Sequence, residues 1–115
     1  MLYNMREIVG EYCITLEDGQ KVYDLIHPQL VAGCSVELSF TGVKVFASPF
    51  FNFAIGQLLV DIHADELNRL LKITNLNAVG ASVLKRVIEN AKRYYSDEHF
   101  YNAVDEVLAE QAISL

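Results

Sequence analysis

The sequence predicts a single α/β domain, residues 1–115, in which a β-sheet carries its helices on one face. Segments with a two-residue hydrophobic period alternate along the chain with segments whose apolar residues recur every three or four positions. The clearest strand is apolar on one side only, whereas strands covered on both faces are usually continuous apolar runs. No repeat, low-complexity segment or Pro/Gly/Ser-rich linker marks a second domain.

The first third of the chain predicts two short strands and a helix. The strands are expected over Met5–Val9 and Tyr12–Ile14. A helix should begin near Thr15 and Asp18, which both offer N-cap oxygens, and should end at Gly33, with Pro28 kinking or shortening it. Its apolar stripe comprises Val22, Leu25, Ile26 and Leu30.

The middle of the chain predicts a strand, a turn and an unusually apolar helix. Apolar and polar residues alternate over Cys34–Phe40, and Thr41-Gly42 marks the turn. Ser48 is expected to be the N-cap and Pro49 the first residue of a helix that runs to Leu59. The core face of that helix would comprise Phe50, Phe51, Ala54, Ile55, Leu58 and Ile62.

The last third predicts a short helical turn around Asp65 and Glu66, a strand over Leu70–Asn75, and a helix over Ala78–Tyr95 capped by Asn77. The inward stripe of that helix is Val83, Leu84, Val87, Ile88 and Ala91, and its outward basic residues are Lys85, Arg86, Lys92 and Arg93.

A final amphipathic helix over about residues 97–112 would form a C-terminal extension. Its apolar residues are Phe100, Val104, Val107 and Leu108, and it carries five carboxylates and no Lys or Arg. Two interpretations are open: this helix docks on the basic helix before it, which we favour, or it is a separate contact arm.

Composition and charge narrow the classes of function. A formal net charge of -6 opposes nucleic-acid binding, because the counterion-release contribution is missing. The sequence has no signal-peptide pattern and no apolar run long enough to span a membrane, so we expect a cytoplasmic protein. Cys13 and Cys34 are expected to be free, buried thiols, and the three histidines have no metal-ligand spacing.

The helix that begins at Ser48 carries a second, narrower apolar stripe. Phe53 and Val60 lie off its core face, near Asn52 and Gly56, and a glycine inside a helix costs about 1 kcal/mol unless another backbone approaches it. One interpretation is that the last helix of the chain covers this stripe. The other is a partner-binding ridge formed by Asn52, Phe53, Gly56 and Val60.

The stretch GCSVELSFTGVKVFASPFFNFAIGQLL, followed by LKITNL and VLKRVIENAKRYY, resembles the bacterial STAS-like domains of unknown function, the DUF4325 group. The similarity extends from about Glu17 to Tyr95. It implies a mixed sheet of about four strands with helices on one face. It also implies a regulatory partner-switching module, often linked with ATP-binding, histidine-kinase-like partners, with no activity established for the group.

The related STAS anti-sigma-factor antagonists carry an Asp-Ser-Ser-Gly turn whose second serine is phosphorylated. At the matching positions this chain has Ala47, Ser48, Pro49 and Phe50, so only Ser48 could accept phosphate, and a plain capping role is the simpler interpretation. Ser39 also departs from the aspartate that relatives commonly have there, which puts in doubt any site that requires a carboxylate.

The sequence therefore predicts a non-catalytic regulatory or adaptor domain without a cofactor or metal. We expect it to bind a protein partner through Ser48, Asn52, Phe53, Gly56 and Val60, and a homodimer is a further possibility. No motif of a P-loop, a nucleophile elbow or a zinc protease is present, so no catalytic residue is predicted. The alternative is a small-molecule or nucleotide sensor that binds an anion near Phe46–Phe50, where Lys44 is the nearest cation in sequence.

Overall fold

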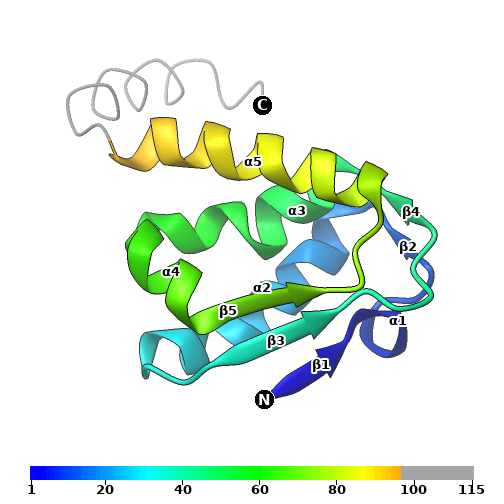
Figure 1. The fold of residues 1–115 in the computed structure, drawn as a ribbon, viewed down its shortest axis with the longest axis horizontal. Helices are drawn as coiled ribbons and strands as arrows, with labels where there is room; N and C mark the ends of the chain where they lie inside the picture. Colours follow the sequence, from blue (N-terminus) through cyan, green and yellow to red (C-terminus); the bar gives the residue numbers. More distant parts are fainter. Residues whose placement is uncertain (97–115) are drawn as a thin grey trace.

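A computed structural model describes residues 1–96 of the chain (Figure 1). The expected helix over about residues 97–112 lies outside this described part. In chain order the elements are β1 (Leu2–Asn4), α1 (Met5–Ile8), β2 (Tyr12–Cys13), α2 (Leu16–Val31), β3 (Val36–Ser39), β4 (Val45–Phe46), α3 (Ser48–Ala54), the 3-10 helix η1 (Gly56–Val60), α4 (Ala64–Leu70), β5 (Leu71–Thr74) and α5 (Ala78–Ser96).

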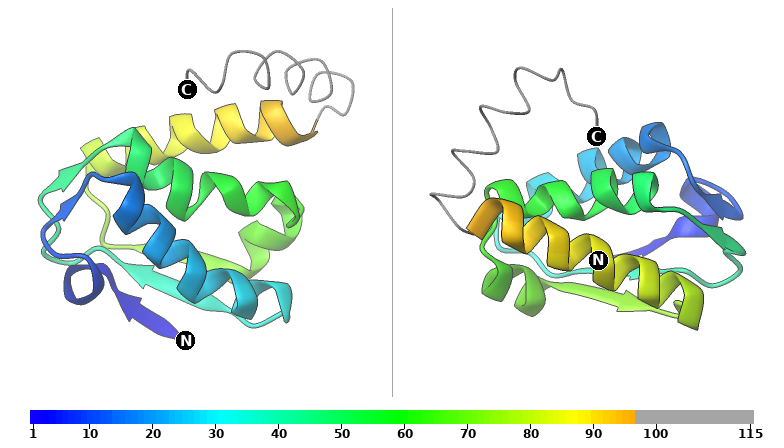
Figure 2. Two further views of the ribbon diagram at one scale, coloured as in Figure 1. Left: turned by 180° about the vertical axis from the view of Figure 1, so that it is seen from behind. Right: turned by 90° about the horizontal axis from the view of Figure 1, so that it is seen from above.

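The main sheet contains three parallel strands in the order β1-β3-β5. Tyr3, Leu38 and Ile73 are register partners across it and point to the same face. Helices α2, α3 and α5 all lie on this one side of the sheet (Figures 1 and 2). The predicted α/β class and the placement of helices on one face are confirmed.

The sheet differs in detail from the expected mixed sheet of about four strands. β2 and β4 form a separate pair, also parallel, in which Tyr12 faces Val45 and Cys13 faces Phe46. All strand pairs within residues 1–96 are therefore parallel. The two short strands of the second pair lead directly into α2 and α3.

The strand predicted over Met5–Val9 is wrong, because this segment forms helix α1 and the strand precedes it. The Asn4 side chain accepts a hydrogen bond from the Arg6 N–H and caps the turn. Met5 is fully buried and Ile8 is partly buried, three residues later. A three-residue apolar spacing in so short a segment fits one helical turn as well as a strand.

Helix α2 follows the prediction closely. The Thr15 hydroxyl accepts the Asp18 N–H at 3.1 Å, and Gly33 closes the helix in a left-handed conformation with φ of 85°. Pro28 lies inside the helix without ending it. The stripe residues Val22, Ile26 and Leu30 are buried, whereas Leu25 is exposed.

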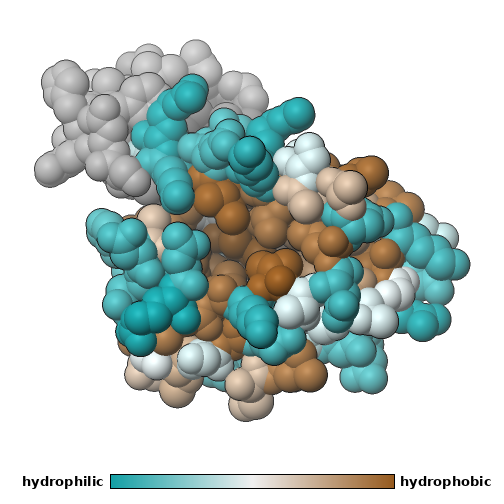
Figure 3. All heavy atoms as spheres, in the orientation of Figure 1, coloured by the Kyte–Doolittle hydropathy of each residue, from teal (hydrophilic) through white to brown (hydrophobic). Residues whose placement is uncertain are grey.

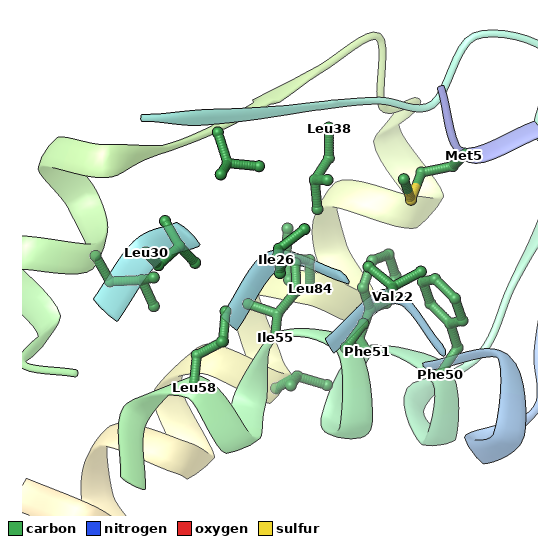
Figure 4. Close-up of a cluster of buried hydrophobic side chains, with 14 of the residues drawn as sticks. Met5, Val22, Ile26, Leu30, Leu38, Phe50, Phe51, Ile55, Leu58 and Leu84 are labelled. Atoms are coloured by element: carbon green, nitrogen blue, oxygen red, sulfur yellow. The ribbon is translucent and has the colours of Figure 1, made fainter. Parts of the chain in front are cut away.

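The core lies between the main sheet and α2, α3 and α5. Figure 4 shows Val22 and Ile26 of α2 together with Phe51 and Ile55, all gathered beneath Leu38 of β3. The predicted core face over the Ser48–Ile62 segment is confirmed, since its six members are all buried.

Cys34 does not join this core, so the expectation of two buried thiols holds for Cys13 only. Strand β3 begins at Val36, and the Cys34 N–H instead donates to the Gln29 carbonyl at the end of α2. The hydrogen bonding of the helix end therefore keeps Cys34 in an exposed turn.

The last elements lie where the sequence places them. β5 and α5 match the predicted strand and helix to within one residue at each end, and the Asn77 side chain accepts the Gly80 N–H at 2.8 Å as a cap. On α5, Leu84, Val87 and Ala91 are buried and Val83 and Ile88 partly so, while the four predicted basic residues are exposed.

Candidate functional site

The start of α3 lies at the surface. Ala47, not Ser48, is the N-cap residue, Ser48 is the first helical residue, and no side chain caps this end. The expected capping role of Ser48 is therefore wrong, because its backbone is already helical and its hydroxyl makes no capping hydrogen bond. Ser48 and Asn52, one turn later, are both exposed.

The single helix expected from Ser48 to Leu59 is divided into two. α3 ends at Ala54, Ile55 departs from helical geometry with φ of -125° and ψ of -46°, and the chain continues as the 3-10 helix η1. Phe53 and Val60 are exposed by 37% and 56%, as predicted, but they lie on different helices.

Gly56 does not belong to an exposed ridge. It is buried, and a Cβ at this position would lie 3.3 Å from Cγ1 of Val87 and 3.9 Å from Cβ of Ala91, both on α5. The ridge of Asn52, Phe53, Gly56 and Val60 therefore fails as one continuous surface. The close approach expected at Gly56 does exist, and α5 supplies it.

A second close helix contact involves Gly19 on α2 and the helix α3. A Cβ on Gly19 would lie 2.4 Å from the Phe50 carbonyl oxygen, 2.9 Å from the Phe53 Cβ and 3.1 Å from the Ala54 nitrogen. Gln57 extends this contact, since its Nε2 donates to Gln20 Oε1 at 3.0 Å and to the Phe53 carbonyl at 2.6 Å. The position of Phe53 at the surface is thus fixed by α2.

Two further exposed apolar residues lie beside this contact. Leu16, 44% exposed, precedes Gly19 by one turn on the same face of α2. Ile14, 40% exposed, follows Cys13, whose carbonyl accepts the Ala47 N–H at the start of α3. We call the residues gathered here the α2–α3 surface: Ile14, Leu16, Ser48, Asn52 and Phe53.

The apolar character continues onto the β2-β4 pair. Tyr12 and Val45 are cross-strand partners, and both are exposed. Sequence reasoning did not identify Ile14, Leu16 and Gly19 as site residues. Gly19 was a usable signal, because a residue without a Cβ on the stripe of a predicted helix can indicate a close neighbour.

Lys44, the cation nearest in sequence to the start of α3, is already paired. Lys44 Nζ lies 3.6 Å from Glu11, which also binds Arg6 at 3.3 Å. The cation nearest in sequence to the proposed anion site is therefore engaged by a carboxylate. Beneath the surface, burial and then the Asp18 charge raise the pKa of the Cys13 thiol from 9.0 to about 12, so this thiol stays protonated.

A second polar group lies where β3 and β5 end. Ser39 Oγ is 3.0 Å from Thr41 Oγ1 and accepts from Asn75 Nδ2 at 3.2 Å, and Asn75 has a φ of 59°. Ligands often bind at this edge of parallel sheets, but here the three side chains satisfy one another. Ser39, which stands where the resemblance leads one to expect aspartate, has a structural hydrogen-bonding role.

Within residues 1–96 no group of three or more His, Cys, Asp or Glu side chains could hold a metal ion. Over the same residues no helix has both the length and the apolar character needed to cross a membrane.

The parallel strands with helices on one side, and the strand-to-helix junction at α3, define a small α/β domain. The family model for the STAS-like domain of unknown function (DUF4325) matches residues 18–81, more than half of the chain. The chain therefore belongs to this family, as its sequence led us to expect. No curated protein and no solved structure matches the chain.

Proposed function

We propose that this chain is a non-catalytic regulatory domain that binds a protein partner through the α2–α3 surface. The observation that carries the proposal is the exposure of Phe53, Leu16 and Ile14, with the polar side chains of Ser48 and Asn52 beside them. Protein interfaces commonly have an aromatic or aliphatic centre with a polar rim, and the bound partner removes the apolar centre from water.

This surface replaces the ridge predicted from the sequence. Ser48, Asn52 and Phe53 remain in it, whereas Gly56 is covered by α5 and Val60 belongs to η1. A stable interface buries roughly 800 Å² on each partner, so Tyr12 and Val45 would extend the contact across the β2-β4 pair.

The proposed partner is an ATP-binding, histidine-kinase-like protein, the class implied by the family resemblance. Ser48 would be the candidate phosphorylation site, because its hydroxyl is exposed and does not serve as a helix cap. Phosphate would add close to two negative charges beside the apolar centre of the surface and would weaken an apolar contact there.

The test compares variants in affinity capture of the tagged full-length chain from its native host. Phe53→Asp and Leu16→Asp each place a charge in the proposed interface and should abolish recovery of the partner. Val60→Asp is the matched control: it also introduces a charge at an exposed apolar residue, but outside the α2–α3 surface, and should leave recovery unchanged.

Loss of the partner with Val60→Asp and not with Leu16→Asp would contradict the proposed surface. Mass spectrometry of the captured chain would test Ser48 phosphorylation directly. Recovery of no partner, together with thermal stabilisation of the protein by ATP, would instead favour the nucleotide-sensor alternative. A ligand at 100 times its Kd should raise the free energy of unfolding by about 2.7 kcal/mol.

A further inference from the structure

An apolar groove runs between α5 and β5, and the space-filling view shows it as a hollowed hydrophobic region (Figure 3). Two hollows form it, and they are adjacent, since both are lined by Ile73, Ile88 and Lys92. The larger hollow is a depression open to solvent, with a volume of about 600 Å³. We call this feature the α5–β5 groove and define it by Leu71, Ile73, Leu76, Lys85, Ile88 and Lys92.

One wall of this groove is formed by β5, which lies at the end of the strand order β1-β3-β5. β5 pairs only with β3 among the described strands, so its other edge has backbone groups without a strand partner. Figure 3 shows hydrophobic surface gathered between α5 and β5. An apolar face beside an unpaired strand edge invites pairing and aggregation, and proteins usually cover such an edge.

The position and the length of the remaining chain suggest what covers the groove. Residues 97–115 follow α5 directly, and Lys92, which lines both hollows, lies four residues before Ser96. Along α5 the larger hollow extends from Ala81 to Lys92, about 16 Å at 1.5 Å per residue. Residues 97–112 are long enough to reverse direction after α5 and cover this distance.

The charges of the two parts are complementary. Lys85 and Lys92 line the groove with Glu89 between them, and neither lysine is in an ion pair within residues 1–96. The remaining chain carries five carboxylates and no Lys or Arg, and its apolar residues repeat at helical spacing: Phe100, Val104, Val107 and Leu108.

We propose that the acidic C-terminal segment, residues 97–112, occupies the α5–β5 groove of its own chain. Its apolar side chains would cover Ile73, Leu76 and Ile88, and its carboxylates would face Lys85 and Lys92. α2 lies on the opposite side of α3 from the β5 edge (Figure 2). A segment bound in the groove therefore leaves the α2–α3 surface free, and this proposal does not depend on the proposed function.

The test uses the full-length chain with one tryptophan. The protein has none, so Phe100→Trp introduces a single reporter in the segment. Its emission should be blue-shifted, as for a buried indole, and should not change with protein concentration. Emission typical of a solvent-exposed indole would overturn the proposal. Burial of the indole that increases with protein concentration would also overturn it, because a second copy of the chain would then occupy the groove.

Charge reversal on α5 provides the matched comparison. Adding Lys85→Glu and Lys92→Glu to the Phe100→Trp protein should shift its indole emission to the red, because the groove would then repel the segment. Arg86→Glu and Arg93→Glu make the same change in charge on the same helix but do not line the groove, so the emission should remain blue-shifted. An equal response from the two double variants would overturn the proposed position, with circular dichroism confirming that each variant is folded.

Discussion

Replacing Gly19 by alanine tests the contact that positions the α2–α3 surface. The added Cβ would lie 2.4 Å from the carbonyl oxygen of Phe50 and 3.1 Å from the nitrogen of Ala54. Both atoms belong to the α3 backbone, so no side-chain rotation can relieve the overlap. The two helices must move apart, and the packing of Phe50 and Phe53 against α2 must loosen.

The expected magnitude follows from two opposing effects. Gly→Ala in an unobstructed helix stabilises by about 1 kcal/mol, whereas overpacking costs about 1 to 3 kcal/mol and occasionally more. Because the obstacle is backbone, we expect the higher cost to prevail and the free energy of unfolding to fall by about 2 kcal/mol. With a urea slope of roughly 1 to 1.5 kcal/mol/M, the unfolding midpoint falls by about 1.5 M.

Gly80→Ala on α5 is the matched control for this measurement. A Cβ there would meet only side-chain atoms, 2.6 Å from Leu76 Cδ1 and 3.1 Å from Phe46 Cδ2, and the partly buried Leu76 can rotate away. Its unfolding free energy should change by less than about 1 kcal/mol, since the gain in helix propensity offsets the contact. A Gly19→Ala protein as stable as wild type, or more stable, would refute the close helix contact.

Two other predictions concern single side chains. In urea unfolding, Ser48→Ala should leave the free energy of unfolding within about 0.5 kcal/mol of wild type, because Ser48 is not a helix cap. Asn77→Ala should lower the free energy of unfolding by about 1 kcal/mol, because it removes a cap. Equal losses for the two variants would contradict the assignment of the caps. For the cysteines, a thiol reagent should modify the exposed Cys34 in the native protein and reach Cys13 only after unfolding. The fold raises the pKa of the Cys13 thiol from 9.0 to about 12, so this thiol ionises at a lower pH in the unfolded chain than in the folded one. The free energy of unfolding should therefore fall between pH 9 and pH 12, by up to about 4 kcal/mol. Cys13→Ala removes the ionising group, so the stability advantage of wild type over this variant should narrow over the same pH range.

Elements with a strong hydrophobic period were predictable from the sequence. Burial against one neighbouring layer produces both the inward stripes of α2 and α5 and the alternation in β3. Apolar residues therefore recur along the sequence with a period of about 3.6 in a helix or 2 in a strand. Thr15 and Asn77 added local signals, because each side chain caps a helix through a hydrogen bond within three residues.

The break between α3 and η1 was not predictable in the same way. Every residue from Phe50 to Leu59 that a continuous helix would bury is in fact buried, so the hydrophobic pattern is nearly the same with or without the break. The change to 3-10 geometry after Ile55 accompanies the contact of Gly56 with Val87 and Ala91 on α5. That contact joins segments about thirty residues apart and leaves no local sequence signature.

The two glycines show why the candidate site could be predicted only in part. Gly56 attracted attention because glycine is costly in a helix, but a cost does not identify the neighbour that justifies it. Gly19 has the same cost and faces the backbone of α3, so it determines where Phe53 emerges relative to Leu16. The sequence could name Phe53 as an exposed apolar residue, but its companions at the surface depend on how α2 crosses α3. A site assembled by such a crossing is sensitive to Gly19 even though this residue is buried and cannot contact a partner.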